Sequence, residues 1–207
     1  MPDAAAAHFA EHRAVAESVD ALLPVLAELT ERLCAAFDGG GRLYTFGNGG
    51  SAADAQHLAA ELIGRYKRHR RPLPAVALSV DPSVVTCIAN DYAWDDVFAR
   101  QVEALARPGD VVAAFTTSGT SENVVRGLTA GRRAGATTVL FGGGAASADG
   151  GPAAAQADYA LVVPSATTAR IQEMHLLLLH AVSEGVDAWA AGESEEGATG
   201  TERGTGG

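Results

Sequence analysis

Two side chains that can move protons, His57 and Glu61, lie four residues apart in an alanine-rich stretch of the sequence. If this stretch is a helix, the spacing places both side chains on one face. An imidazole and a carboxylate placed in this way could act as an acid/base pair or bind a metal ion. A solvent-facing His/Glu pair on an ordinary helix would give the same pattern, so the spacing alone leaves both interpretations open.

A glycine-rich segment, Gly47-Asn48-Gly49-Gly50-Ser51, comes directly before this stretch. Its three glycines let the backbone turn tightly and bring N–H groups close to a ligand. The helix that follows offers unpaired N–H groups and the positive end of its dipole, which together favour a phosphate. Ser51 stands where an N-cap hydroxyl is expected. The segment therefore predicts a phosphate-binding turn, with a purely structural glycine turn as the alternative.

A second loop, rich in hydroxyl groups, follows the apolar run at residues 111–115. Five of its six residues carry a hydroxyl: Thr116, Thr117, Ser118, Thr120 and Ser121. Hydroxyl-rich turns also occur as simple helix caps, but here the strand–loop–helix pattern of the first loop is repeated. We therefore expect a second anion-binding loop.

Strands and helices alternate around these loops. We expect strands at residues 43–46, 75–79, 111–115, 137–141 and 159–163, and helices at residues 51–66, 83–90, 95–105, 121–134 and 168–189. This alternation predicts a parallel sheet of about five strands with helices on both faces, a three-layer α/β/α fold. Ligands of such sheets bind beyond the carboxyl ends of the strands, where both loops fall.

The residues before the first strand predict extra helices. Apolar residues recur every three or four positions from Val15 to Leu33, and Pro24 indicates a break with a second start near Asp20. We expect residues 1–40 to pack on the main domain, residues 41–191, and on partner subunits. The last segment, residues 192–207, is rich in Gly, Thr and Glu and is expected to be a disordered tail.

The composition excludes several classes of protein. A chain of 207 residues that is 47% hydrophobic can form one domain with a substantial core. Its formal net charge of −10 argues against nucleic-acid binding. No apolar run is long enough for a membrane span, and no secretory signal is evident. Cys34 and Cys87 show no paired spacing typical of a disulfide or a zinc–thiolate site. We therefore expect a cytoplasmic protein.

A basic cluster lies at the end of the helix expected at residues 51–66. Its members are Arg65, Lys67, Arg68, His69, Arg70 and Arg71. Positive charge at a helix C-terminus complements the helix dipole, which is a sufficient structural reason for the cluster. It could also attract an anionic substrate, and Arg65 is the member best placed to do so.

Five sequence blocks stand in order along the chain: GNGGS at residues 47–51, HLAAEL at 57–62, AND at 89–91, TSGTSENV at 117–124 and RIQEMH at 170–175. Over roughly residues 15–190 they resemble the phosphoheptose isomerases of the sugar isomerase (SIS) superfamily. The resemblance implies an aldose–ketose isomerase that interconverts sedoheptulose 7-phosphate and D-glycero-D-manno-heptose 7-phosphate, the first step towards nucleotide-activated heptoses. It also implies a homotetramer with active sites between subunits, and no nucleotide cofactor.

By this resemblance, Glu61 and His180 form the acid/base pair. The substrate-binding residues are expected to be Asn48, Gly49, Gly50, Ser51, Glu61, Arg65, Asn90, Asp91, Thr116, Thr117, Ser118, Ser121 and Gln172. The chain departs from the family pattern at Thr116, where the family has Ser, and at Thr120, where it has Asn. Ala169 stands where some members carry Asp.

Family members can also bind zinc, through residues that match His57, Glu61, Gln172 and His180. On one straight helix Gln172 and His180 would be ~12 Å apart. One metal ion can join them only if the side chains converge, the helix start is irregular, or two subunits share the site. A zinc-bound Glu61 would also be a poorer base, so the metal could be structural or regulatory.

Two other functions fit parts of the sequence. Some SIS proteins are scaffolds that bind a replication initiator; they lack the glutamate and the second histidine, so Glu61 and His180 favour an enzyme. An isomerase of another sugar phosphate is the other alternative. The remaining histidines are expected to have no catalytic part: His175 in packing or an interface, and His8, His12 and His69 as solvated side chains.

Overall fold

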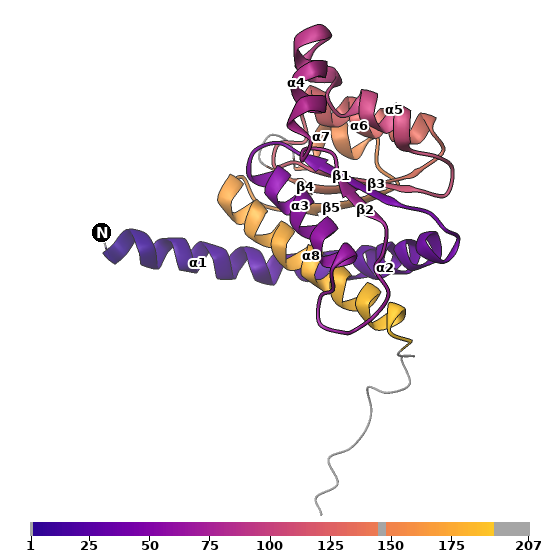
Figure 1. Cartoon of the computed structure of the whole chain (residues 1–207). Helices are drawn as coiled ribbons and strands as arrows, with labels where there is room; N and C mark the ends of the chain where they lie inside the picture. The colour runs from indigo at the N-terminus through magenta and orange to yellow at the C-terminus, as the bar shows by residue number, and fades with distance from the viewer. Residues whose placement is uncertain (1, 145–147, 193–207) are drawn as a thin grey trace, which may run out of the picture.

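The computed structural model describes residues 2–144 and 148–192 and has a five-stranded sheet at its centre (Figure 1). All neighbouring strands are parallel, in the order β2-β1-β3-β4-β5. The strands are β1 (Leu43–Gly47), β2 (Ala75–Ala77), β3 (Val111–Phe115), β4 (Thr137–Gly143) and β5 (Tyr159–Val163). Every residue of β1 and β3 is buried, as expected for central strands covered on both faces.

Helices cover both faces of the sheet, which confirms the three-layer α/β/α fold. One face packs against α2 (Leu23–Asp38), α3 (Gly50–Ile63) and α8 (Thr168–Ala190). The other packs against α5 (Ala99–Leu105), α6 (Glu122–Arg133) and α7 (Gly151–Ala154). Figure 1 shows these two groups on opposite sides of the strands. The core is therefore split into two apolar layers by the sheet.

The N-terminal helices behave differently from one another. The break predicted near Pro24 is present as η1 (Val19–Leu22), which separates α1 (Pro2–Ser18) from α2. In α2, Pro24 lies in the first turn, where its missing N–H is not needed. Five residues of α2 are buried in the core, whereas α1 extends away from the body in Figure 1.

Two histidines of α1 contact the start of α8. Arg170, whose side chain is fully buried, donates a hydrogen bond to the backbone oxygen of His8, and His12 pairs with Glu173 at 2.7 Å. His8 and His12 are partly exposed, but they are not the isolated solvated side chains expected from the sequence. They help to dock α1 on α8.

Several element boundaries differ from those expected. The helix expected at residues 51–66 is α3, and it ends at Ile63 because the chain turns away at Gly64. The segment expected as one helix at residues 95–105 is split into η2 (Trp94–Asp96) and α5. The short α7 was not expected, and α4 spans Pro82–Asp91. Within the described ranges no helix has both the length and the apolar character needed to cross a bilayer. Beyond Gly192, the expected tail lies outside the described residues.

Candidate active site

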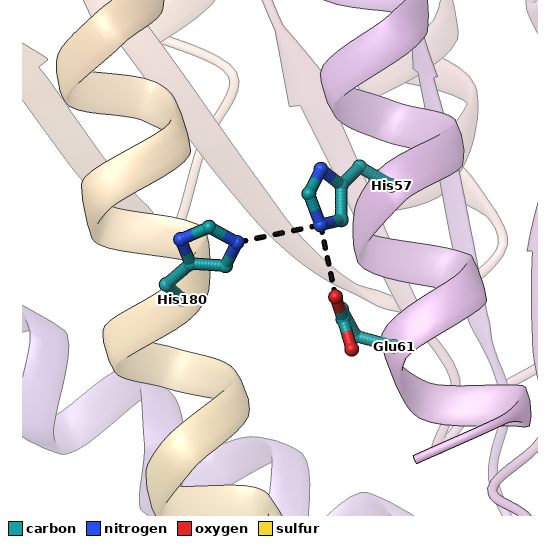
Figure 2. A group of neighbouring side chains, drawn as sticks. All are labelled: His57, Glu61 and His180. Atoms are coloured by element: carbon teal, nitrogen blue, oxygen red, sulfur yellow. Dashed lines mark hydrogen bonds and ion pairs between the residues drawn. The ribbon is translucent and has the colours of Figure 1, made fainter. Parts of the chain in front are cut away.

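Three side chains from two helices meet on one side of the sheet (Figure 2). His57 Nε2 lies 2.9 Å from Glu61 Oε1 on α3 and 3.3 Å from His180 Nε2 on α8. One ligand atom of each residue lies within 4.8 Å of the other two. We call this group the His57–Glu61–His180 trio. It joins the pair indicated by the i,i+4 spacing to a residue 119 positions further along the chain than Glu61.

The trio forms because α3 and α8 run side by side in the same direction. Near their starts, Gly50 faces Gln172 so closely that a Cβ on Gly50 would lie 2.5 Å from the Gln172 amide nitrogen. Two turns further along, His57 meets His180. Leu58 of α3 and Leu178 of α8 belong to the same buried cluster, which holds the two helices together. The absence of a side chain at Gly50 thus allows the close approach.

The surroundings of the trio shift the pKa of its member His180 and of the neighbouring Asp54. Burial lowers the pKa of His180, and the nearby His57 lowers it further against a smaller opposing effect of Glu61. Burial also raises the pKa of Asp54 to about 6, against a smaller effect of His57. Asp54 lies three residues before His57 on α3, and its Oδ2 is buried with no hydrogen-bond partner in the described chain. A carboxyl that keeps its proton to a higher pH than an ordinary aspartate therefore lies beside the trio.

A cavity of about 200 Å³ lies beyond the carboxyl ends of β1 and β3. None of the described residues that line it is charged, and three helices begin at its wall: α3, α6 and α8. The positive ends of their dipoles make it a site for an anion without a basic side chain. Its lining residues are Asn48, Ser51, Phe115, Thr116, Thr117, Ser118, Ser121, Thr168 and Gln172.

The glycine-rich turn is built differently from the sequence expectation. Gly49, with φ +58°, is the N-cap residue of α3, and Ser51 is the second residue of the helix. Ser51 is therefore not the N-cap that was expected; its buried side chain lines the cavity instead. The left-handed φ explains why glycine is needed at position 49.

A larger cavity, of about 490 Å³, lies at the opposite ends of the strands. It is lined mainly by glycines and backbone, together with Arg42, Arg107 and Asp110. Asp110 already accepts hydrogen bonds from the backbone N–H groups of Arg42 and Arg107. The smaller cavity is the better candidate, since it lies at the end of the sheet where ligands of parallel sheets bind. It is also lined by the starts of α3 and α8, the two helices that carry the trio.

Comparison with known proteins identifies the family. The SIS domain family matches residues 7–143. The phosphoheptose isomerase of Aquifex aeolicus (strain VF5) is 52% identical over 155 residues, 75% of this chain and 79% of that protein. The phosphoheptose isomerase of Bordetella avium (strain 197N) is 46% identical over 192 residues, 91% of this chain and 95% of that protein. The chain belongs to the phosphoheptose isomerases of the SIS domain family.

Solved structures of this family have the same fold. The phosphoheptose isomerase of Neisseria gonorrhoeae superposes with a TM-score of 0.83 at 40% identity, over 90% of this chain and 98% of that one. The phosphoheptose isomerase of Francisella tularensis gives a TM-score of 0.84 at 30% identity, over 89% of this chain and 97% of that one. The similarity therefore extends over nearly the whole of both solved chains.

The residues carried over from the phosphoheptose isomerases fall into three places. Asn48, Ser51, Thr116, Thr117, Ser118, Ser121 and Gln172 line the cavity. Gly49 and Gly50 form the turn beside it. Glu61 and His180 lie in the trio, about three turns after Gly50 along α3 and about two turns after Gln172 along α8.

Three expected residues lie outside the cavity of this chain. Arg65 is exposed just after α3, and its Nη1 donates to the backbone oxygen of Lys67. Asn90 and Asp91 end α4, where the Asn90 amide donates to the Asp91 carboxylate at 2.7 Å. Both are exposed, and neither lines the 200 Å³ cavity.

The fourth expected zinc ligand, Gln172, is separated from the other three. Helix α8 is continuous from Thr168, so an irregular start does not bring Gln172 towards His180. The amide of Gln172 lies against Gly50 at the cavity instead. The described chain thus offers a possible three-residue metal group, His57, Glu61 and His180.

Some residues of the site were not singled out from the sequence. Asn123 and Thr168 contact or line the binding region, and Asp54 lies beside the trio. Asp54 could have been found, because it continues the i,i+3/i+4 series Gly50, Asp54, His57, Glu61 along one helix face. His175 is a packing residue, as expected: it is buried, its Nε2 lies 2.9 Å from the Gly142 oxygen, and its ring packs against Phe115.

Proposed function

We propose that the protein is an aldose–ketose isomerase that converts sedoheptulose 7-phosphate to D-glycero-D-manno-heptose 7-phosphate. The observation that carries the proposal is that the parallel helices α3 and α8 bring Glu61 and His180 together around His57, two to three helical turns from an anion-binding cavity. The high identity to phosphoheptose isomerases supports the choice of substrate. A non-catalytic SIS scaffold would have no use for this acid/base pair.

The phosphate of the sugar binds in the cavity in this proposal. Hydroxyl groups of Thr117, Ser118 and Ser121 and the N-terminal N–H groups of α3 and α6 supply hydrogen bonds to its oxygens. Because the side chains that line the cavity in the described ranges are all uncharged, helix dipoles and neutral donors hold the dianion in this proposal. Anchoring the phosphate places the carbonyl end of the sugar towards the trio and supplies binding energy away from the reacting atoms.

Glu61 and His180 carry the proton transfers. As the ketose reacts, the Glu61 carboxylate takes a proton from C1 while the C2 carbonyl oxygen gains one from His180, which leaves an enediol with a C1–C2 double bond. The imidazole then takes the proton of the C1 hydroxyl as Glu61 returns its proton to C2, forming the aldose. The lowered pKa of His180 favours the neutral imidazole near neutral pH and makes the protonated ring a stronger acid towards the sugar oxygen.

We further propose that the trio binds zinc. Zn–N and Zn–O bonds of about 2.0–2.2 Å place tetrahedral ligand atoms ~3.4 Å apart. The 2.9 Å and 3.3 Å separations around His57 Nε2 suit such a site. A bound zinc ion would polarise the sugar oxygens as a Lewis acid. Gln172 could complete the ligand set only through a rearrangement or from another subunit.

We also propose a homotetramer in which neighbouring subunits complete the site. Leu176 and Leu177 on α8, Trp94 and Tyr92 are large apolar side chains exposed on the single chain. Asn90 and Asp91 lie next to Tyr92, so burial of this surface would bring them to a neighbouring site. Arg65, exposed beyond Glu61, would likewise face the bound anion of an assembled site.

The test is incubation of the purified protein with sedoheptulose 7-phosphate in D₂O, followed by NMR. We expect the aldose to appear with deuterium at C2, because the proton on Glu61 exchanges with solvent during the transfer. A Glu61→Gln variant is the matched control. Absence of any aldose in the wild-type sample would rule out this reaction, and conversion of other sugar phosphates only would redirect the substrate assignment.

A further inference from the structure

Asp187 is a fully buried carboxylate on α8, two turns after His180. Its side chain is 1% exposed, and it accepts hydrogen bonds from the backbone N–H groups of Tyr66, Lys67 and Arg68 at 3.4, 2.9 and 2.6 Å. Burial alone would raise the pKa of Asp187, but these donors and Arg70 outweigh it and hold the pKa below its usual range. Asp187 therefore fixes the backbone of residues 66–68 to α8.

Arg70 extends this attachment to α3. Its side chain is also 1% exposed, and its Nε donates to Asp187 Oδ1 at 2.9 Å. The guanidinium also donates to the backbone oxygens of Glu61 and Leu62, both at 2.7 Å, near the end of α3. These carbonyls have no partner within the helix, so Arg70 satisfies them. We call Asp187, Arg70 and the backbone of residues 66–68 the Asp187 clasp.

The clasp determines where the side chain of Tyr66 lies. The Tyr66 ring stacks on the His180 ring, with the centroids 5.6 Å apart and the planes inclined at 29°. The His180 ring also contacts the His57 ring edge-on, with the two ring centroids 5.0 Å apart. The imidazole is therefore held between two rings, and its Nε2 is directed at His57 Nε2.

A buried ion pair by itself gives little net stability, because desolvation of both charges offsets their attraction. Packed apolar residues could join α3 to α8 as well. The Asp187–Arg70 pair instead specifies geometry through its hydrogen bonds. The Asp187 carboxylate accepts from four donors, and the Arg70 guanidinium donates five hydrogen bonds. Such an arrangement specifies one loop conformation, the one that carries Tyr66 to His180.

We propose that Tyr66 is a positioning residue for His180, held in place by the Asp187 clasp. The proposal rests on the proposed isomerase function, in which His180 moves protons at the sugar oxygens. Stacking restricts rotation of the imidazole and keeps Nε2 directed into the trio, where the proposed reaction places the reacting end of the sugar. The contribution should appear in the chemical step and not in substrate binding, since the phosphate cavity lies about two helical turns away.

The test compares Tyr66→Leu with Tyr66→Phe. Leucine removes the aromatic face, and we expect kcat on sedoheptulose 7-phosphate to fall about tenfold while KM changes less than about twofold. Phenylalanine keeps the ring and should restore most of the wild-type kcat. Equal losses in both variants, or a rise in KM alone, would overturn positioning by stacking. A wild-type kcat in the leucine variant would do so too.

A second readout does not depend on turnover. The ring protons of His180 feel the ring current of Tyr66, so we expect their NMR shifts to change in Tyr66→Leu and, in the same direction, in Asp187→Asn. Glu184→Gln is the matched control, because Glu184 pairs with the side chains of Lys67 and Arg68 on the same segment but not with Arg70. It should leave the shifts and the kcat unchanged.

These two readouts separate the possible failures. An inactive wild-type protein would count against the proposed reaction, while the His180 shifts would still decide the placement of the ring. Unchanged His180 shifts in a folded Asp187→Asn protein would overturn the clasp. If that variant does not fold, Tyr66→Leu decides alone, since Tyr66 is only partly buried and its replacement leaves the Asp187–Arg70 pair intact.

Discussion

The side-chain amides of Asn48 and Asn123 bond each other in both directions at 2.9 Å. Asn48 belongs to the glycine-rich turn after β1, and Asn123 to the first turn of α6, after the hydroxyl-rich loop. Asn123 is 2% exposed and Asn48 is partly buried, so this pair is a largely buried link between the two loops that line the cavity. It ties the two halves of the proposed phosphate site into one unit.

We expect Asn123→Ala to weaken substrate binding more than the chemical step. The substitution leaves the Asn48 amide without its buried partner, at a cost of about 1–3 kcal/mol, and loosens one loop against the other. KM for sedoheptulose 7-phosphate should rise about tenfold, with kcat within about threefold of the wild type. Steady-state kinetics measure both; a lower kcat at unchanged KM would contradict a binding role.

Glu61→Gln should remove the isomerisation while the protein stays folded. An amide nearly matches the carboxylate in shape but cannot accept the proton from carbon, so turnover should fall by about 10²–10⁴. Binding of the sugar phosphate, followed by calorimetry, should stay within a few fold because the cavity is intact. If the purified variant keeps most of the wild-type turnover, Glu61 is not the base.

His180→Asn should likewise give a folded protein with turnover lower by about 10²–10⁴, since asparagine cannot shuttle protons near neutral pH. His69→Asn is a suitable control, because His69 is exposed and lies outside the trio.

Zinc content and the melting temperature should be measured on both histidine variants. If His180 acts only as a ligand of a structural metal ion, His180→Asn should lose zinc and melt at a lower temperature, and added zinc should recover activity. Loss of turnover with normal zinc content and an unchanged melting temperature would instead identify a proton-transfer role. Full activity in His180→Asn would show that another group performs this step.

His175 should make the folded protein less stable in acid. Burial lowers the pKa of His175 to about 4, against a smaller effect of its hydrogen bond to Gly142. Above about pH 6.5 the ring is neutral in both states and stability is complete; as the pH falls towards 4, the unfolded chain binds a proton that the folded protein does not. The free energy of unfolding should drop by about 2 kcal/mol between about pH 7.5 and 5 from this residue.

Urea unfolding at the two pH values measures this difference. His175→Gln, whose amide can still donate to the Gly142 oxygen, should lose about 2 kcal/mol of the pH dependence, because glutamine does not titrate. Other titrating groups contribute equally to both proteins. An unchanged pH dependence in the variant would contradict this prediction, because it would mean that His175 accepts a proton in the folded protein as readily as in the unfolded chain.

Removal of α1 should reduce the oligomeric state and the activity together. A deletion up to residue 37 would also remove α2, whose Leu29 and Leu33 are buried in the core, so the deletion should end at Ser18. Phe9 of α1 is 64% exposed in the single chain, which is consistent with a partner surface. Light scattering and the isomerase assay test the prediction; an active, folded monomer would contradict it.

Much of the fold and part of the site could be predicted from local sequence signals. The apolar run of β3 and the glycine and hydroxyl loops predicted a strand–loop–helix repeat, because these signals act between neighbouring residues. The pair His57 and Glu61 followed from helix periodicity alone. Family resemblance added His180, and Ser51 was assigned to a capping role that Gly49 in fact performs.

Only the tertiary structure showed how the distant groups are brought together, and which of them are kept apart. The contact of His180 with His57 requires α8 to pack parallel to α3, and this packing depends on the tight approach at Gly50 and on a shared apolar core. The same packing places Asp187 against residues 66–68 and separates Gln172 from the trio. Residue spacing fixes directions along one helix, but the distance between two helices is set by the side chains packed between them.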